Sequence, residues 1–412
     1  MAITRMAELQ TVVHGAETLV MGPDPDETLE VIDDGAVAII DGRVAASGAT
    51  DEVTREYPPE NAETNLDATG RTVLPGFVDS HTHAVYAGDR ADEFEARLQG
   101  VSYQDILAEG GGILRTVDAV READIGTLRD RLLAIIETMA NHGATTVEVK
   151  SGYGLDTENE LKQLRAIEQA DEEHSVELVA TFLGAHAVPD EMDQPTYVEQ
   201  VVDEQLPAVV EAGLAEYGDV FCDDGAFTLE EARTILEATA EAGLELKVHA
   251  DEFARLGASQ LAAELGATSA DHLLHSTQAD ANALADAGVV PTLLPGTAFT
   301  LGVEYADPDK FLEAGTYPAL ASDFNPNCYL PSMIATIQFA CHGMGMTPAE
   351  AIRGATIEGA RALDRSDKVG HLNEGASGDL LIADVPSHVH LAYRFGSNHV
   401  DTVLKEGTII DE

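Results

Sequence analysis

Basic residues are scarce in this sequence. Its 412 residues include only 23 lysines and arginines, 6 of them lysines, against 74 aspartates and glutamates, so the formal net charge is −51. Nucleic acids and anionic membranes would repel such a chain, and both are therefore excluded as expected partners. A hydrophobic content of 44% argues against the disorder that often accompanies so high a charge. The composition predicts a folded protein with an acidic, lysine-poor surface, suited to the cytosol of a halophile, where concentrated salt screens the repulsion.

Cysteine and long apolar runs are also rare. The three cysteines, Cys222, Cys328 and Cys341, form no C-x-x-C pair and are odd in number. We therefore expect no disulfide framework, as is usual in a reducing compartment. Residues 1–17 lack the apolar core of a signal peptide, and no run approaches the roughly 20 residues that cross a membrane. These absences predict a cytoplasmic protein.

Both ends of the chain have the pattern of short strands joined by tight turns. Residues 36–46 (AVAIIDGRVAA) contain an Asp-Gly pair, which suits the positive φ angles of a two-residue hairpin. The C-terminal part contains an apolar strand at 379–385 and a second hairpin with a Glu-Gly turn. Neither end is long enough to bury a core of its own. We expect residues 1–74 and 370–412 to pair into one small β-domain.

Between these ends, over residues 75–369, apolar strands alternate with helical segments, which is typical of a parallel α/β architecture. Capping boxes at Thr157 and Thr228, and the T-P-A-E sequence at 347–350, mark helix starts. The predicted strands are 76–79, 145–150, 177–183, 219–222, 245–249, 269–272, 289–294 and 319–323. Eight β/α units predict a closed, TIM-like (β/α)8 barrel.

Side chains of the kind that bind metals follow five of these eight strands. A barrel of this kind carries its chemistry at the C-terminal ends of its strands. A single histidine there is more often a satisfied core or loop residue, but five such strand ends together favour a metal site. The side chains concerned, in chain order, are His81 and His83, His186, His249, His272 and Asp323.

Four of these side chains make a ligand set for one divalent or ferric ion: His81, His83, His249 and Asp323. A catalytic ion must keep one position open for water, and a base must move the proton of that water. Glu252 lies three residues after His249, close enough to line the same pocket. Glu252, His272 and Asp323 are therefore the candidate proton carriers.

The motifs around these residues resemble those of the amidohydrolase superfamily over nearly the whole chain. They are PGFVDSHTHAVYAGDR, VEVKSGYGLD, FLGAHAVP, KVHADEF, SADHLL and SDFNPNC. Within the superfamily they are similar to the enzymes that open the ring of 4-imidazolone-5-propanoate with water, giving N-formimidoyl-L-glutamate in histidine degradation. The resemblance implies that reaction here, with zinc or iron as cofactor. It also implies a single ion, because binuclear members carry a carboxylated lysine after strand four, where this chain has Phe221-Cys222-Asp223.

The resemblance also assigns a role to each matching residue. The matched metal ligands are His81, His83, His249 and Asp323. The groups matched to water activation and proton transfer are Glu252 and His272. The positions matched to substrate contacts are Arg90, Tyr153, His186, Glu252, Asn325, Asn327 and Cys328. The chain departs from the pattern at Asn327-Cys328, where relatives more often have Gly followed by Ser or Thr; Asn tolerates the positive φ that Gly would supply.

Two other functions are compatible with parts of this pattern. Another mononuclear amidohydrolase, such as a nucleobase or aminoazine deaminase, shares the ligand set, but Arg90 and the S-G-Y-G loop favour a substrate with an acidic side arm. A non-catalytic barrel that binds a small molecule would have lost at least one of the ligands or Glu252, and none is missing. Family precedent alone indicates a possible homodimer.

Overall fold

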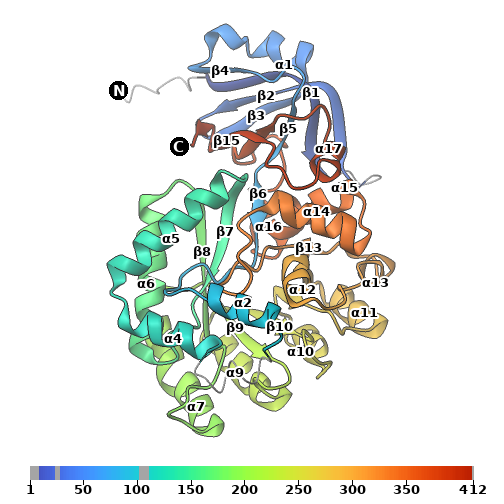
Figure 1. Ribbon diagram of the computed structural model, residues 1–412. Coiled ribbons are helices and arrows are strands. Elements are labelled where there is room, and N and C mark those ends of the chain that lie inside the picture. The colour runs from blue at the N-terminus through green and yellow to red at the C-terminus, as the bar shows by residue number, and fades with distance from the viewer. Residues whose placement is uncertain (1–8, 24–27, 102–110, 411–412) are drawn as a thin grey trace.

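The computed structural model describes residues 9–23, 28–101 and 111–410. Figure 1 shows two parts, a barrel surrounded by helices and a smaller β-sheet stacked on one end of it. Each part is built around one eight-stranded sheet. The fold class predicted from the sequence is therefore confirmed.

The smaller sheet joins the two ends of the described chain. Its strand order is β16-β15-β14-β5-β1-β2-β3, with β4 paired to β1. Strands β5 and β14 pair antiparallel, with Val73 opposite Ile382, and this pairing links the N-terminal strands to the C-terminal ones. The strands are β1 (Leu9–Gly22), β2 (Glu30–Ile40), β3 (Arg43–Ala49), β4 (Thr64–Asp67), β5 (Thr72–Pro75), β14 (Leu380–Ala383), β15 (Val400–Lys405) and β16 (Thr408–Ile409). The limits 1–74 and 370–412 stay a prediction.

The turn between β2 and β3 follows the sequence prediction. Asp41 and Gly42 both have positive φ angles, 49° and 76°, and Ile40 pairs with Arg43 across them. This is the two-residue geometry that an Asp-Gly pair favours. The same conformation occurs at Glu406 and Gly407, with φ of 47° and 73°, between β15 and β16.

The barrel strands run parallel in the order β13-β12-β11-β10-β9-β8-β7-β6. They are β6 (Phe77–Asp79), β7 (Ala144–Lys150), β8 (Glu177–Ala185), β9 (Tyr217–Cys222), β10 (Glu245–Ala250), β11 (Ser269–His272), β12 (Val290–Leu293) and β13 (Ala319–Leu320). All eight overlap the strands that the sequence predicts. The last is shorter than predicted, because the chain after Leu320 bridges to the segment after β6 instead of extending β13.

That bridge closes the barrel at the candidate ligands. Thr82 and Phe324 form a parallel bridge, and the backbone N–H of Asp323 donates to the carbonyl oxygen of His81 at 3.1 Å. The N–H of His83 donates to the carbonyl oxygen of Phe324 at 2.8 Å. The segments that carry three of the four candidate ligands are therefore hydrogen-bonded side by side.

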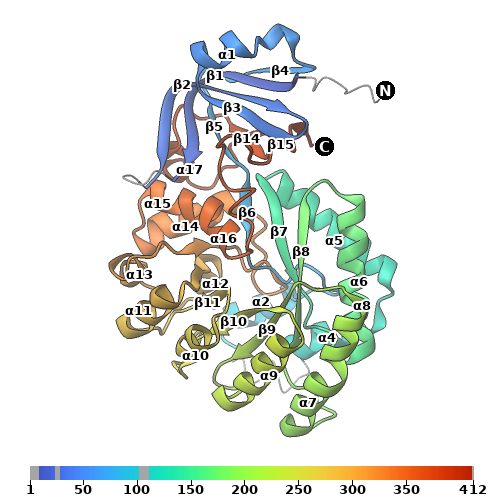
Figure 2. The same ribbon diagram turned by 180° about the vertical axis from the view of Figure 1, so that it is seen from behind.

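Helices lie around the barrel strands and beside the small sheet (Figure 2). They are α1 (Thr50–Glu56) beside the small sheet, and then α2 (Ala91–Leu98), α4 (Ile113–Glu122), α5 (Ile125–Ala140), α6 (Thr157–Glu173), α7 (Gln194–Gln200), α8 (Leu206–Ala212), α9 (Leu229–Glu241), α10 (Ala258–Leu265), α11 (Gln278–Ala287), α12 (Pro295–Leu301), α13 (Asp309–Glu313), α14 (Met333–Met344), α15 (Pro348–Arg353), α16 (Gly359–Arg361) and α17 (Val389–Tyr393). Short helical turns are η1 (Pro59–Asn61), η2 (Val201–Gln205) and η3 (Gly354–Glu358). Within the described ranges, no helix is long and apolar enough to cross a membrane.

Helices begin at or next to all three predicted starts, and the cap signals are confirmed at two of them. Thr228 and Thr347 form capping boxes with the glutamates three residues later. The box predicted at Thr157 is wrong, because the side chain of Asp156 caps α6 by accepting from the N–H of Asn159 at 2.8 Å. Glu160 points elsewhere, into the loop after β7.

Candidate functional site

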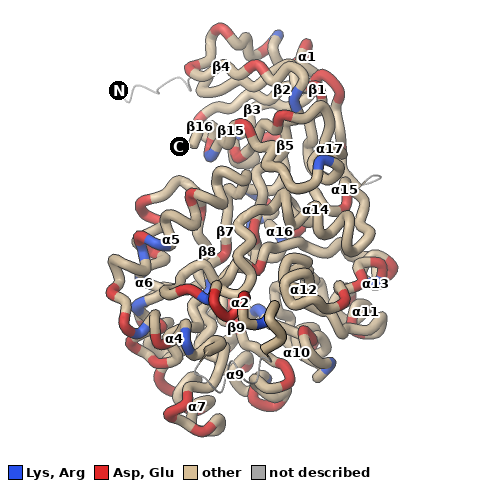
Figure 3. The backbone as a smooth tube through the Cα atoms, viewed as in Figure 1, with Lys and Arg blue, Asp and Glu red and all other residues tan. Residues whose placement is uncertain are grey.

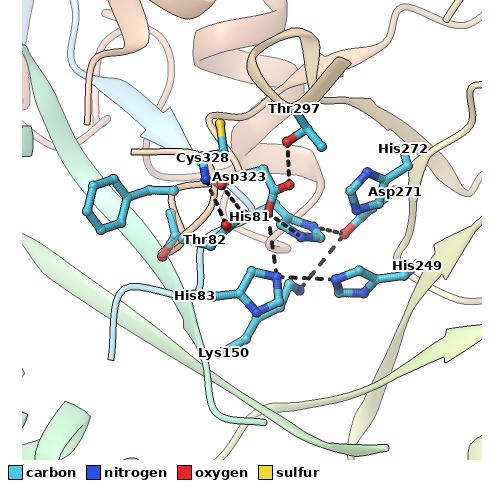
Figure 4. A network of polar contacts seen from close by, with 12 residues as sticks. His81, Thr82, His83, Lys150, His249, Asp271, His272, Thr297, Asp323 and Cys328 are labelled. Carbon is cyan, nitrogen blue, oxygen red and sulfur yellow. Dashed lines mark hydrogen bonds and ion pairs between the residues drawn. The ribbon is translucent and has the colours of Figure 1, made fainter. Parts of the chain in front are cut away.

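The four candidate metal ligands converge at the C-terminal ends of the barrel strands. His81 and His83 follow β6, His249 lies in β10, and Asp323 follows β13. All four side chains are buried. One ring nitrogen from each of the three histidines lies within 4.8 Å of the others. Figure 4 shows the Asp323 carboxylate meeting the imidazoles at the same point.

The distances between the donor atoms fit a single cation. His83 Nε2 lies 3.3 Å from His249 Nε2, and Asp323 Oδ1 lies 3.6 Å from His81 Nε2 and 3.5 Å from His83 Nε2. Donors bound at about 2.0–2.1 Å around a tetrahedral ion lie roughly 3.3–3.4 Å apart. His81 Nε2 and Asp323 Oδ1 are buried and have no hydrogen-bond partner in the part of the chain that the structure describes. These residues therefore fit a metal ion.

Two carboxylates behind the histidines turn the rings towards this point. Asp271 Oδ2 lies 2.6 Å from His81 Nδ1, and Asp219 Oδ2 lies 2.9 Å from His249 Nδ1. A carboxylate beside Nδ1 keeps the ring proton on that nitrogen and leaves the lone pair of Nε2 free for a metal. The sequence prediction missed both aspartates. The available signal was an acidic residue inside each of two short barrel strands, DVFC and SADH.

Burial is the largest influence on the pKa values of three candidate ligands, His81, His83 and Asp323. It lowers the pKa values of His81 and His83 well below the ordinary range, so both rings are neutral and can donate lone pairs. Burial also raises the pKa of Asp323 to about 6. A nearby cation would oppose that rise and favour the carboxylate form.

Glu252 lines the cavity just after β10. Burial, and then the neighbouring carboxylates of Asp323 and Asp223, raise its pKa well above the usual value for glutamate. The Asp223 side chain holds the Glu252 segment in place, because it accepts the backbone N–H groups of Glu252, Phe253 and Ala254 at 2.7, 2.9 and 2.9 Å. A carboxyl group with a raised pKa at a fixed place is suited to proton transfer near neutral pH.

His272 lies beside Glu252, with His272 Nε2 3.7 Å from Glu252 Oε2. Burial lowers the pKa of His272 well below its ordinary value. Both of its ring nitrogens lack hydrogen-bond partners among the described residues. His272 ends β11 with a φ of 76°, a left-handed conformation that is uncommon for residues other than glycine and that clusters at functional sites.

A cavity of about 140 Å³ opens beside the cluster. Most predicted substrate contacts line it, and so do several residues that the sequence prediction missed. The residues predicted to contact substrate that line it are Arg90, Tyr153, His186, Glu252, Asn325 and Asn327. The unpredicted ones are Ile113, Phe221, Phe253, Thr297 and Leu301. Thr297 also donates its hydroxyl to Asp323 Oδ2.

The loop after β7 holds Tyr153 in the cavity wall. Glu160 accepts the backbone N–H groups of Gly152, Gly154 and Leu155 at 3.0, 2.8 and 2.9 Å. Gly152 has a φ of 104°, and a Cβ there would lie 2.8 Å from the carbonyl oxygen of Leu183, so only glycine fits. The loop is thus built around a buried carboxylate.

The cavity lining contains both a charged and a neutral side chain, Arg90 and His186. Arg90 donates from Nε to Glu93 Oε2 at 2.8 Å, which fixes the plane of its guanidinium group. The ring of His186 stacks on that of His83 with centroids 4.9 Å apart, and burial lowers the pKa of His186 to about 3. A substrate in this cavity would meet the cationic side chain of Arg90 and the neutral imidazole ring of His186.

Cys328 does not line the cavity, although the sequence predicts a substrate contact there. Its side chain is buried, with Sγ 3.6 Å from Thr300 Oγ1 and 3.9 Å from the carbonyl oxygen of Ser322. Its backbone N–H donates to Asn325 Oδ1 at 2.9 Å. Asn327 has no positive φ, so the loop does not need a glycine-like conformation at that position.

Comparisons with known proteins agree with this geometry. The family model for the amidohydrolase family matches residues 72–410. The chain is 58% identical to the imidazolonepropionase of the halophile Haloarcula marismortui over 98% of this chain and 97% of that protein. It is 43% identical to the imidazolonepropionase of Geobacillus kaustophilus over 98% of this chain and 97% of the relative.

A solved structure extends the comparison to the fold. An adenosine deaminase from Xanthomonas campestris with bound zinc matches with a TM-score of 0.73, covering 98% of this chain and 93% of that one. Sequence identity in this match is 16%, so the likeness concerns the fold alone.

Proposed function

This chain belongs to the amidohydrolase family, and from that premise we propose that it hydrolyses 4-imidazolone-5-propanoate to N-formimidoyl-L-glutamate, a step of histidine degradation. The similarity to halophile imidazolonepropionase, 58% identity over 98% of the chain, carries this conclusion. The four-donor cluster and the cavity beside it supply the groups that such a ring opening needs.

We propose that one zinc or iron ion per chain is held by His81, His83, His249 and Asp323. Separations of 3.3–3.6 Å between donor atoms support this set. When bound, such an ion lowers the pKa of a water molecule and polarises a carbonyl group. Strand β9 ends in Phe221-Cys222-Asp223, with no lysine of the kind that binuclear relatives carry after strand four, which supports a single ion. The Asp223 carboxylate there is occupied by three backbone N–H groups.

Glu252 is assigned the proton transfer. Hydrolysis adds water to a ring carbon and breaks the bond from that carbon to nitrogen, so a proton must pass from the water to the departing nitrogen. Glu252 faces the cavity and has a raised pKa, so it can take the proton and release it again near neutral pH. His272, whose Nε2 lies 3.7 Å from Glu252 Oε2, and Asp323 are the other candidate proton carriers.

We assign to Arg90 the binding of the substrate's propanoate carboxylate. Arg90 lines the cavity, and its guanidinium group keeps donors besides the Nε that binds Glu93. Tyr153, His186, Asn325 and Asn327 line the remaining wall and are assigned to the ring and its polar atoms. Cys328 supports the substrate loop through its N–H bond to Asn325, without touching substrate.

A comparative product assay tests the reaction. Freshly prepared 4-imidazolone-5-propanoate is offered in molar KCl beside cytosine, guanine and a hydantoin. We expect turnover of the first alone, with N-formimidoyl-L-glutamate as the product. Ammonia release from cytosine or guanine, with no ring opening of the imidazolone, would assign the chain to the deaminases instead.

The proposal also covers the cellular compartment and the oligomeric state of the protein. We propose a cytoplasmic enzyme, supported by Cys222, Cys328 and Cys341, which are all free thiols. Family precedent favours a homodimer, and light scattering at molar KCl measures its mass. A monomer mass of 43.6 kDa would exclude the dimer.

A further inference from the structure

Lys150 is a fully buried charge at the end of β7, beside the histidine cluster (Figure 4). Its Nζ lies 2.6 Å from Glu148 Oε1, 2.9 Å from Asp219 Oδ2 and 3.9 Å from Asp271 Oδ2. Burial alone would lower the pKa of Lys150, but these carboxylates outweigh it and hold the pKa above the ordinary value. Lys150 is therefore an ammonium ion whose neighbours are three buried carboxylates.

Two of these carboxylates are the ones that orient the candidate ligands. The same Asp219 Oδ2 that lies near Lys150 is 2.9 Å from His249 Nδ1, and the same Asp271 Oδ2 is 2.6 Å from His81 Nδ1. One ammonium group thus lies between the two oxygens that face two of the ligand rings. Without it, two buried carboxylates that now share one cation would lose that compensating charge, which is unfavourable.

The third carboxylate, Glu148, connects Lys150 to the segment that carries His81 and His83. Glu148 accepts from the hydroxyl of Thr181 at 2.5 Å and from the N–H of Thr82 at 3.3 Å. Thr82 stands between His81 and His83, and its carbonyl oxygen accepts the backbone N–H of Lys150 at 2.9 Å. Lys150 is therefore fixed from both its backbone and its side chain.

We propose that Lys150 is a positioning residue of the metal centre, which holds Asp219 and Asp271 so that His249 and His81 present Nε2 to the same ion. It touches neither the substrate nor the reacting atoms. This inference rests on the proposed metal site. It predicts that removing the ammonium group weakens metal binding through the two aspartates, because one of them then loses its contact with Lys150 and moves, and its histidine loses its orientation.

Lys247 provides a matched control. It is also fully buried in the barrel, in β10, but its Nζ contacts the carbonyl oxygens of Ser80 at 3.1 Å and Ala362 at 3.2 Å. No carboxylate pairs with it within the described ranges. If Lys150 had a purely structural role, replacing either lysine should have the same effect on metal binding.

The test compares Lys150→Met and Lys247→Met in the full chain at molar KCl. Zinc affinity is measured by competition with a chelator, and the absorption bands of the cobalt-substituted proteins report ligand geometry. We expect Lys150→Met to lower zinc affinity by about 10- to 100-fold, the usual effect of losing a residue that orients a ligand, and to shift the cobalt bands. Lys247→Met should keep the affinity and spectrum of the starting protein.

The single variant Lys150→Met could fail to fold, because it leaves buried carboxylates without their cation. The double variant Glu148→Gln/Lys150→Met is therefore tested beside it. It removes the ammonium group together with its nearest carboxylate and so leaves the buried net charge unchanged. Zinc affinity should still fall, because Asp219 and Asp271 keep no cation between them. Equal zinc affinity in the starting protein and in whichever Lys150 variant folds would overturn the role of Lys150. A starting protein that binds no metal would instead overturn the proposed metal site.

Discussion

The side chains of the cavity fall into two groups, those that meet at the candidate metal position and those that face the space beside it. The first group, His81, His83, His249 and Asp323, could be predicted from sequence because each follows or ends a barrel strand. Asp219, Asp271 and Lys150 could not be assigned in the same way. An acidic or basic residue inside a strand acquires its partner only when the barrel closes, and the partners here come from distant strands.

Arg90→Ala tests the second group. Because Arg90 lines the cavity but is not one of the candidate metal ligands, its loss should weaken substrate binding by about 2 to 5 kcal/mol and leave metal content unchanged. Steady-state kinetics and elemental analysis measure the two effects separately. Arg129→Ala, which removes a surface pair on α5, is the control. Unchanged KM and kcat in Arg90→Ala would show that another group binds the carboxylate.

Glu252→Gln separates proton transfer from metal binding. The amide preserves the shape of the side chain but cannot exchange a proton, so activity should fall by about 100-fold or more while the metal stays bound. Metal analysis and single-turnover kinetics check both statements. Loss of the metal in this variant would make Glu252 a ligand and not a proton carrier.

At the scale of elements, the alternation of apolar strands and helices was sufficient to predict eight barrel strands, whereas local details depended on the closed structure. The predicted strand at 319–323 keeps only two residues in β13, since Asp323 and Phe324 bond to the segment after β6. The predicted cap at Thr157 fails for a related reason. Asp156 satisfies the helix end, which leaves Glu160 free to bind the loop.

Glu160→Ala is a test of that loop. Three backbone N–H groups, of Gly152, Gly154 and Leu155, would lose their acceptor. Each buried donor left unsatisfied costs about 1 to 3 kcal/mol, so the free energy of unfolding should fall by at least about 2 kcal/mol. KM should rise as well, because Tyr153 loses its support. Denaturant unfolding at molar KCl measures the stability, and Glu158→Ala, an exposed residue of the same first turn, should change neither quantity. Equal stability of the two variants would contradict this role for Glu160.

For the whole molecule, composition predicted the surface and pattern predicted the pairing of the two chain ends. Asp and Glu are spread over both the barrel and the small sheet, with few Lys and Arg between them (Figure 3). The stacking of the small sheet on one end of the barrel could not be predicted, because it depends on contacts between residues far apart in sequence.

The formal charge of −51 predicts that folding depends on salt. The folded chain holds its carboxylates closer together than the unfolded chain does, and few lysines offset their repulsion. The screening length falls from about 30 Å at 0.01 M salt to about 3 Å at 1 M. Thermal unfolding followed across a KCl series should therefore show a midpoint that rises with salt, with structure and activity lost below a few tenths molar. A midpoint that is flat or falls between low and molar KCl would contradict the salt adaptation.

The most direct test of a mononuclear metal-dependent ring opening is a titration of the metal-free protein. Zinc or iron is added stepwise in molar KCl, and hydrolysis of 4-imidazolone-5-propanoate is measured at each step. The site formed by His81, His83, His249 and Asp323 predicts negligible activity without metal and a linear rise that saturates at one equivalent per chain. Full activity in the metal-free protein, or saturation only at two equivalents, would contradict it.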